Sequence, residues 1–331
     1  MKLRHGISAR AIWLICTAAA ALTAAALRRW QLQSAFEGVA GLAIPGAQAS
    51  VVLTCVLVMT GAGFAILALV GRPLPRRVRW DQVFLSAGDR AFPALEIAAA
   101  FFAIAAVPVL FIVGVDQFQF YQEMLAAHRQ NSAVQIPADN GLLILATAGG
   151  AAMAALGLLQ TGRDSLNPGR RGRGGFSAVL PGVAGCIWLM ESFRSHAANP
   201  VRWDYAPQLL AIVLGMAFYM DFAGMSAGTA RPRRLLWLAG MTEAFSAVAL
   251  VGAVSELAAR AGARQTLCCT QLGDVALLFA QMLAAGGVLW RLPPSLEGPA
   301  PDSSVPDSPS EPEPELDPDP IQEIQEDSTD E

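Results

Sequence analysis

Long apolar runs separated by short polar segments recur from near the N-terminus to about residue 290. A helix that crosses the hydrocarbon core of a bilayer needs about 20 predominantly apolar residues. The runs of sufficient length cover about residues 9–27, 47–70, 92–114, 141–160, 175–192, 207–229, 235–257 and 271–290. Backbone in lipid must satisfy its own hydrogen bonds, and the alternation typical of barrel strands is missing from these runs. The pattern therefore predicts an all-α, polytopic integral membrane bundle of about eight transmembrane helices.

The first run has a second interpretation. Lys2, Arg4 and Arg10 precede or open it, and it ends in Ala24–Ala26, as a cleavable signal peptide does. The length of the run and the two arginines directly after it favour a retained helix instead. Cleavage would leave seven spans in the same orientation.

Composition divides the chain into a membrane-embedded body and a tail. The chain is 54% hydrophobic and 15% charged, and its net charge is −4. Residues 292–331 hold thirteen acidic residues, ten prolines and no Lys or Arg, so the body itself is basic. The tail has too few apolar residues to bury a core, which predicts a disordered, acidic, Pro-rich segment. The segment Ile321–Ile324 is a candidate docking motif for a cytoplasmic protein, and solvated filler is the alternative.

The distribution of Lys and Arg predicts the orientation. In an eight-span topology, the N-terminus, the even-numbered loops and the tail hold 16 of the 23 basic residues. Both termini are therefore predicted to be cytoplasmic. The loop 167–175 carries Arg170, Arg171 and Arg173 among glycines, which superficially resembles an RNA-binding segment. We interpret it as a flexible turn that contacts anionic lipid, and we predict no nucleic-acid partner.

Two acidic residues within consecutive apolar runs are the first candidates for chemistry. Asp221 and Glu243 lie at equal separations before and after Pro232, in the turn between the sixth and seventh runs. If both runs continue as helices up to this turn, the two carboxyl groups reach one depth on adjacent helices. They would then share a proton or bind a cation, with Glu96 as a further embedded acid. For the first two residues the alternatives are a structural hydrogen-bonded pair or two acids capped separately by polar neighbours. For Glu96 the alternative is snorkelling to the interface.

A second group of candidates lies near the opposite ends of the helices. Glu191, Arg194, His196 and Asp204 surround the fifth loop and suggest a polar mouth for a solute, with His196 as its titratable element. Local roles are the alternative, because Glu191 and Arg194 are spaced for an ion pair and Asp204 is placed to cap the sixth helix. Further charged residues at helix ends fall on the same side: Asp116, Glu256, Arg260 and Asp274.

The longest loop, residues 116–140, is predicted either to form an amphipathic helix on the outer interface or to act as a substrate lid. The chain has no Walker, HExxH or G-x-S-x-G motif, and its five cysteines lack metal-ligand spacing. We therefore assign no catalytic residue, metal or cofactor, and we do not favour an enzyme. The two remaining hypotheses are a carrier or ion-coupled permease for a small solute and a scaffold or sensor that acts through its tail.

The stretch 191–230, with Phe193, His196, Asn199-Pro200 and Tyr205, is followed by Arg233-Arg234. This stretch resembles a pattern in uncharacterised multi-span membrane proteins of anaerobic Gram-positive bacteria. The resemblance implies a bacterial plasma-membrane location and no known activity. It assigns no functional residues.

Overall fold

The structure is a computed structural model that describes residues 8–36, 43–70, 76–84, 90–132, 140–166, 176–197, 205–262 and 270–295. The long helices in these ranges are α1 (Ala9–Ser34), α2 (Gln48–Val70), α4 (Ala91–Gln130), α5 (Gly141–Leu166), α6 (Val179–Ala197), α7 (Ala206–Ala223), α8 (Pro232–Gly262) and α9 (Thr270–Ser295). A short helix α3 (Trp80–Val83) and a 3₁₀ turn η1 (Phe176–Ala178) precede α4 and α6.

Seven of the described helices, all of the long ones except α6, are long and apolar enough to cross a membrane. Large apolar side chains such as Leu22, Met59 and Phe101 remain exposed on the outside of the bundle, which is consistent with contact with lipid. The absence of strands among the described elements agrees with the predicted all-α fold. The chain is a multi-pass membrane protein.

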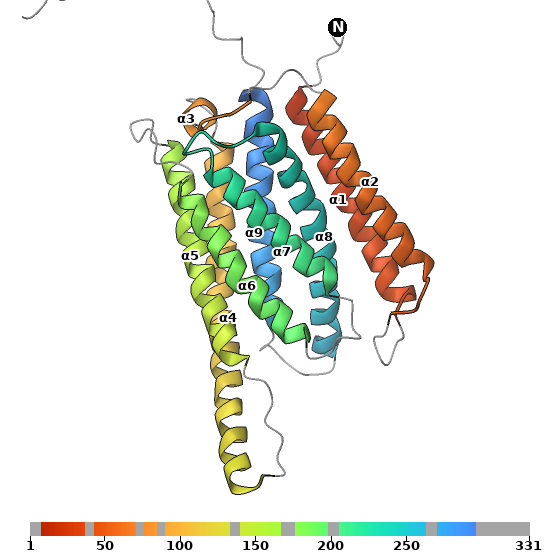
Figure 1. Ribbon diagram of the computed structural model, residues 1–331, viewed down its shortest axis with the longest axis vertical. Coiled ribbons are helices and arrows are strands. Elements are labelled where there is room, and N and C mark those ends of the chain that lie inside the picture. Colours follow the sequence, from red (N-terminus) through yellow and green to blue (C-terminus); the bar gives the residue numbers. More distant parts are fainter. Residues whose placement is uncertain are drawn as a thin grey trace, which may run out of the picture. The chain divides into compact units, whose positions relative to one another are not determined.

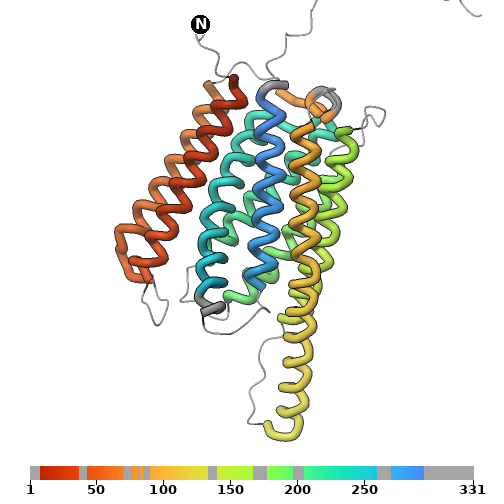
Figure 2. Tube along the Cα trace, turned by 180° about the vertical axis from the view of Figure 1, so that it is seen from behind, coloured from red at the N-terminus to blue at the C-terminus, as the bar shows by residue number. Residues whose placement is uncertain are grey.

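Successive long helices run in opposite directions across the bundle (Figure 1). We call the end at which α1 begins and α9 ends the N-side, and the opposite end the far side. Helix α9 contacts α4, α8 and α1, and Figure 2 shows it between α8 and α4. The α1–α2 hairpin packs beside α8, while α5 and α6 cover α4 and α7. Residues on α9 are therefore central to the bundle.

Helix α4 is longer than the sequence predicts. The apolar run ends near residue 114, but the helix continues to Gln130 and extends beyond the far side of the bundle (Figure 1). Residues 116–130, which were predicted to form either an amphipathic helix on the interface or part of a lid, continue α4 instead. A methyl group at Gly141 would lie 2.5 Å from the backbone nitrogen of Phe118, so α5 begins in close contact with α4 at this level. Only Gly fits such an approach.

Helix α7 is shorter than predicted, because it ends at Ala223 rather than near residue 229. The following residues form turns, and Gly228 adopts a positive φ of 66° that interrupts any helix. The backbone nitrogen of Trp80 donates to Met225 O over 3.1 Å, so α3 is bound to this turn. Asp221 thus lies within one turn of the end of α7, whereas Glu243 lies about three turns inside α8. The expectation that both acids lie at one depth is not met.

An aromatic cluster closes the N-side of the bundle. Its ring contacts include Trp80 with Phe84 at 4.5 Å and Phe84 with Phe92 at 4.3 Å between centroids. The cluster consists of Trp80, Phe84, Phe92, Phe218 and Phe222. Arg291 Nε donates to the carbonyl oxygen of Val83 over 2.9 Å, which ties α3 to α9. Residues 76–84, between α2 and α4, therefore pack into the bundle.

Several predicted features lie outside the described residues. They are the tail beyond Ser295, the loop arginines Arg170, Arg171 and Arg173, and Asp204.

Candidate functional site

A polar cavity of about 250 Å³ lies at the far side of the bundle. It is lined where α1, α6 and α8 end and where α7 and α9 begin. Two of the predicted mouth residues, Glu191 and His196, line this cavity. Arg194 is exposed and does not line it. The cavity is large enough for several water molecules or a small organic molecule.

Asp274, near the start of α9, is the central charged residue of the cavity. Its Oδ1 accepts a hydrogen bond of 2.8 Å from the indole Nε1 of Trp188 on α6. Its charge interacts with those of Glu191, Glu256 and His196, which come from α6 and α8. Glu256 also accepts a bond of 3.1 Å from Gln271 Nε2. Carboxyl groups from three helices therefore surround one space.

Arg28 is the residue of this cavity that the sequence analysis overlooked most clearly. It lies at the end of the first apolar run, where arginine was interpreted only as a signal of topology. In the structure its side chain is buried, with 3% exposed, and Nη1 donates to Gln31 over 2.6 Å. A methyl group at Gly252 would lie 3.5 Å from Nη2, so α8 supplies the space for the guanidinium group. A basic residue directly after a long apolar run was the available signal.

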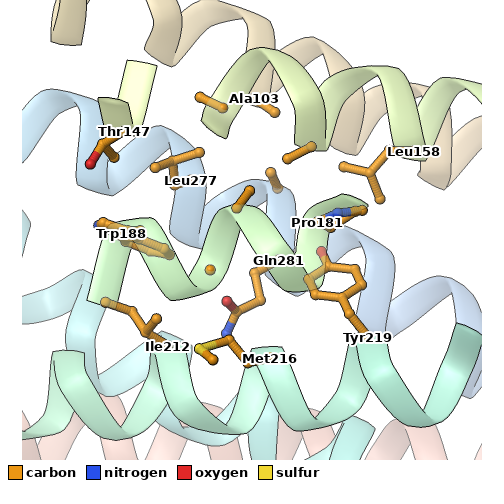
Figure 3. Close-up of a pocket in the computed structure, with 15 residues that line it drawn as sticks. Ala103, Thr147, Leu158, Pro181, Trp188, Ile212, Met216, Tyr219, Leu277 and Gln281 are labelled. Atoms are coloured by element: carbon orange, nitrogen blue, oxygen red, sulfur yellow. The ribbon is translucent and has the colours of Figure 1, made fainter. Parts of the chain in front are cut away.

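A second, smaller cavity of about 40 Å³ lies deeper in the bundle, between α4, α5, α6, α7 and α9 (Figure 3). Most of its lining is apolar, and Trp188 separates it from the Asp274 carboxyl group. Figure 3 shows Gln281 in the middle of this cavity, between Trp188 and Tyr219. Gln281 Nε2 donates to Ala211 O over 2.8 Å and to Ser246 Oγ over 3.0 Å. The interior thus holds a satisfied amide in mainly apolar surroundings.

The predicted acids Glu96 and Glu243 lie on either side of α9, toward the N-side. A methyl group at Gly286 would lie 3.0 Å from Glu243 Oε1, and one at Gly287 would lie 3.5 Å from Glu96 Oε1. Consecutive glycines therefore make room for both carboxyl groups at nearly one level of α9. Glu96 is 0% exposed, and neither of its oxygens has a hydrogen-bond partner among the described residues. A buried carboxyl group without a hydrogen bond is costly.

Asp221 belongs to different surroundings. Its Oδ2 lies 3.7 Å from Arg234 Nε, and the arginine side chain is largely exposed. Among the described residues, no hydrogen bond or ion pair is found between Asp221 and Glu243. The structure brings Glu243 together with Glu96 around α9, and it pairs Asp221 with Arg234.

Polar groups lie at three levels along α9. Asp274 lies at the far side and Gln281 lies in the middle. At the third level, Glu96 of α4 lies beside Gly287. The first and last levels are roughly 20 Å apart along the helix axis. No group of three His, Cys, Asp or Glu in the described ranges is arranged to hold a metal ion. Comparison of the chain with protein-family models, curated proteins and solved structures found no match.

Proposed function

We propose that this protein is a proton-coupled carrier of a small solute in a bacterial plasma membrane, with both termini in the cytoplasm. The observation that carries this proposal is Glu96, a fully buried carboxyl group without a hydrogen-bond partner in the described part of the chain. Ionisable groups inside membrane helices are rare because they are costly, and they are typical of ion pathways. Replacement of this carboxyl group by an apolar side chain would stabilise the fold. The presence of Glu96 therefore favours a role in proton movement.

The position of Glu96 supports this role. It lies one turn after Phe92 of the aromatic cluster, which separates it from the N-side. On its other side lie the interior cavity with Tyr219, whose hydroxyl interacts electrostatically with Glu96, and beyond it the polar cavity. This arrangement suits one state of an alternating-access carrier, with a solute cavity at the far side and a closed N-side. The far side faces the exterior in the proposed orientation.

Glu243 is the second candidate proton site, since it faces α9 at the level of Glu96. Two carboxyl groups on neighbouring faces of one helix, about 100° apart around its axis, allow a proton to bind either of them as α9 shifts or rotates. The consecutive glycines at 286 and 287 remove the side chains that would otherwise separate these groups from the helix. Coupling of proton movement to solute transport would then depend on a movement of α9. That movement would change which side of the bundle the solute and the proton can reach.

The experiment uses the purified full-length protein in liposomes loaded with a pH-sensitive dye. A solute panel is added outside, comprising 1,4-diaminobutane, alanine, glucose and succinate, and internal pH is followed in parallel with protein-free liposomes. The carrier proposal expects at least one solute to change internal pH faster in the protein-containing liposomes. Equal traces in both kinds of liposome for every solute would contradict it.

The composition of the tail favours a second function, a membrane scaffold or sensor that recruits a cytoplasmic protein. Thirteen acidic residues in 292–331 would provide a charged docking segment. A chain that ends at Glu297 distinguishes the two proposals, because the compact unit Met1–Glu297 contains all the described helices. The carrier retains its solute-driven proton movement without the tail, whereas a scaffold loses its partner. Contact of Arg170, Arg171 and Arg173 with anionic lipid is proposed on the same basis of charge.

A further inference from the structure

The described lining of the far-side cavity has an unbalanced set of charges. Among the described residues, three carboxyl groups line it, those of Glu191, Glu256 and Asp274, against the guanidinium group of Arg28 and the imidazole of His196. Arg28 donates a hydrogen bond to Gln31, on its own helix. Glu191 and Asp274 are both nearly buried, with 3% and 6% exposed, and their charges act on each other. Two neighbouring buried carboxylates repel unless a positive group lies between or beside them.

A polar side chain of the cavity wall lacks a partner. Ser192 is 1% exposed, it lines the cavity next to Glu191, and its hydroxyl has no hydrogen bond among the described residues. Buried hydroxyl groups are nearly always hydrogen-bonded, so the hydroxyl of Ser192 is free to pair with a molecule that occupies the cavity. This observation is independent of the charges.

The acids are distributed in a way that suits an organic molecule. Glu256 and Asp274 accept hydrogen bonds from Gln271 and Trp188, and the three carboxyl groups, which come from three helices, form no arrangement in the described ranges that could hold a metal ion. A ligand that reaches them has to extend across the cavity and present hydrogen-bond donors. His196 and Tyr205 stack at 4.6 Å between ring centroids and add an aromatic wall that suits the carbon chain of such a ligand.

We propose that the far-side cavity binds a small organic cation, with an ammonium group held between Glu191 and Asp274 and near the hydroxyl of Ser192. The inference rests on the proposed function, because it assigns the class of solute to the same carrier. Ammonium groups donate up to three hydrogen bonds, which matches two carboxylates and one hydroxyl oxygen. Neutral and anionic solutes of equal length lack either the charge or the donors.

The test measures binding rather than transport, so that it is separate from the carrier experiment. The full-length protein in nanodiscs is titrated by calorimetry with four molecules built on a four-carbon chain: 1,4-diaminobutane, 4-amino-1-butanol, 1,4-butanediol and succinate. The thermal unfolding midpoint is measured with each. The two amines are expected to bind and to raise the midpoint, because a ligand of the folded state stabilises it. Binding of the diol or succinate as tightly as the amines, or of none of the four, would overturn the proposal.

Variants then locate the site. Glu191→Gln and Asp274→Asn keep the side-chain shape and an acceptor for neighbouring donors, and each is expected to weaken amine binding about tenfold or more. Glu123→Gln is the matched control, because Glu123 is an exposed carboxylate on the extension of α4 and lies outside the cavity. Unchanged amine affinity in both cavity variants would place binding elsewhere and refute the assignment.

The two proposals fail in different ways. Amine binding without any solute-driven proton movement would refute the carrier and leave the cation site standing. Proton movement driven by glucose or succinate, with no amine binding, would leave the carrier standing and refute the cation site.

Discussion

The indole Nε1 of Trp188 donates a hydrogen bond of 2.8 Å to Oδ1 of Asp274, and this bond joins α6 to α9 between the two cavities. Trp188 lines the interior cavity and Asp274 lines the far-side cavity. The pair therefore forms the boundary between the polar far side and the apolar interior.

Replacement of this donor is expected to destabilise the protein. Trp188→Phe keeps an apolar ring but removes the indole donor from the buried Asp274 carboxyl group, at a cost of about 1.5–3 kcal/mol. Trp237→Phe is the matched control, since Trp237 Nε1 donates over 2.9 Å to the uncharged carbonyl of Gly61 and its loss costs about 1 kcal/mol. Thermal unfolding midpoints in nanodiscs compare the two. Equal shifts, or a smaller one for Trp188→Phe, would show that the carboxyl group does not depend on the indole.

Because α5 packs closely against the start of α6, alanine substitutions at two glycines of α5 are expected to differ in their effect on the free energy of unfolding. A methyl group at Gly157 would lie 2.6 Å from the backbone oxygen of Ser177 and 2.7 Å from Cδ of Pro181, whereas one at Gly149 would meet no atom within 4 Å. Gly157→Ala is therefore expected to lower the free energy of unfolding by about 1–3 kcal/mol, because the two helices must separate. Gly149→Ala should leave it unchanged or raise it by up to about 1 kcal/mol. The same thermal measurement checks both, and a tolerated Gly157→Ala would refute the packing.

Much of the membrane architecture follows from hydrophobic length alone. The starts of the predicted runs agree with the helices within a few residues, because apolar runs of about 20 residues leave few alternatives in lipid. The end of α7 could not be found in this way. The residues after Ala223 are mostly small and partly apolar, and their turns accept a hydrogen bond from Trp80, which is distant in the sequence. Tertiary contacts thus ended a helix that composition would have continued.

The same limit applies to the candidate site. The sequence identified Glu96 and Glu243 as candidates because charge in an apolar run stands out, and it identified Glu191 and His196 because polar residues gather around the fifth loop. It could not show which of them meet, because the packing of α9 between α4 and α8 is not encoded in any local pattern. Their equal spacing from Pro232 suggested that Asp221 and Glu243 meet. That inference required α7 to continue as a helix up to the turn at Pro232.

The separation of Asp221 from Glu243 predicts additive effects. Asp221→Asn removes a partly exposed contact with Arg234 and is expected to change the free energy of unfolding by about 1 kcal/mol or less. The double variant with Glu243→Gln should equal the sum of the two single effects within about 0.5 kcal/mol, as for residues without shared partners. A larger coupling energy in this double-mutant cycle would show that Asp221 and Glu243 interact directly.

The cost of burying Glu96 predicts a gain or no loss of stability when its charge is removed. Glu96→Met keeps an unbranched side chain of similar length and removes a carboxyl group that lacks hydrogen bonds in the described structure. Its thermal unfolding midpoint is expected to equal or exceed that of the wild type. Glu123→Met, at an exposed position of the same helix, is the control. A marked fall for Glu96→Met alone would mean that the carboxyl group stabilises the fold.

The most direct measurement of the central claim is solute-driven proton movement by the Glu96→Gln variant in dye-loaded liposomes, beside the wild type and Glu123→Gln. Gln fits the same space but cannot carry a proton, so each solute that moves protons in the wild type should move none in Glu96→Gln, while Glu123→Gln behaves as the wild type. Wild-type rates of proton movement in Glu96→Gln would contradict the account.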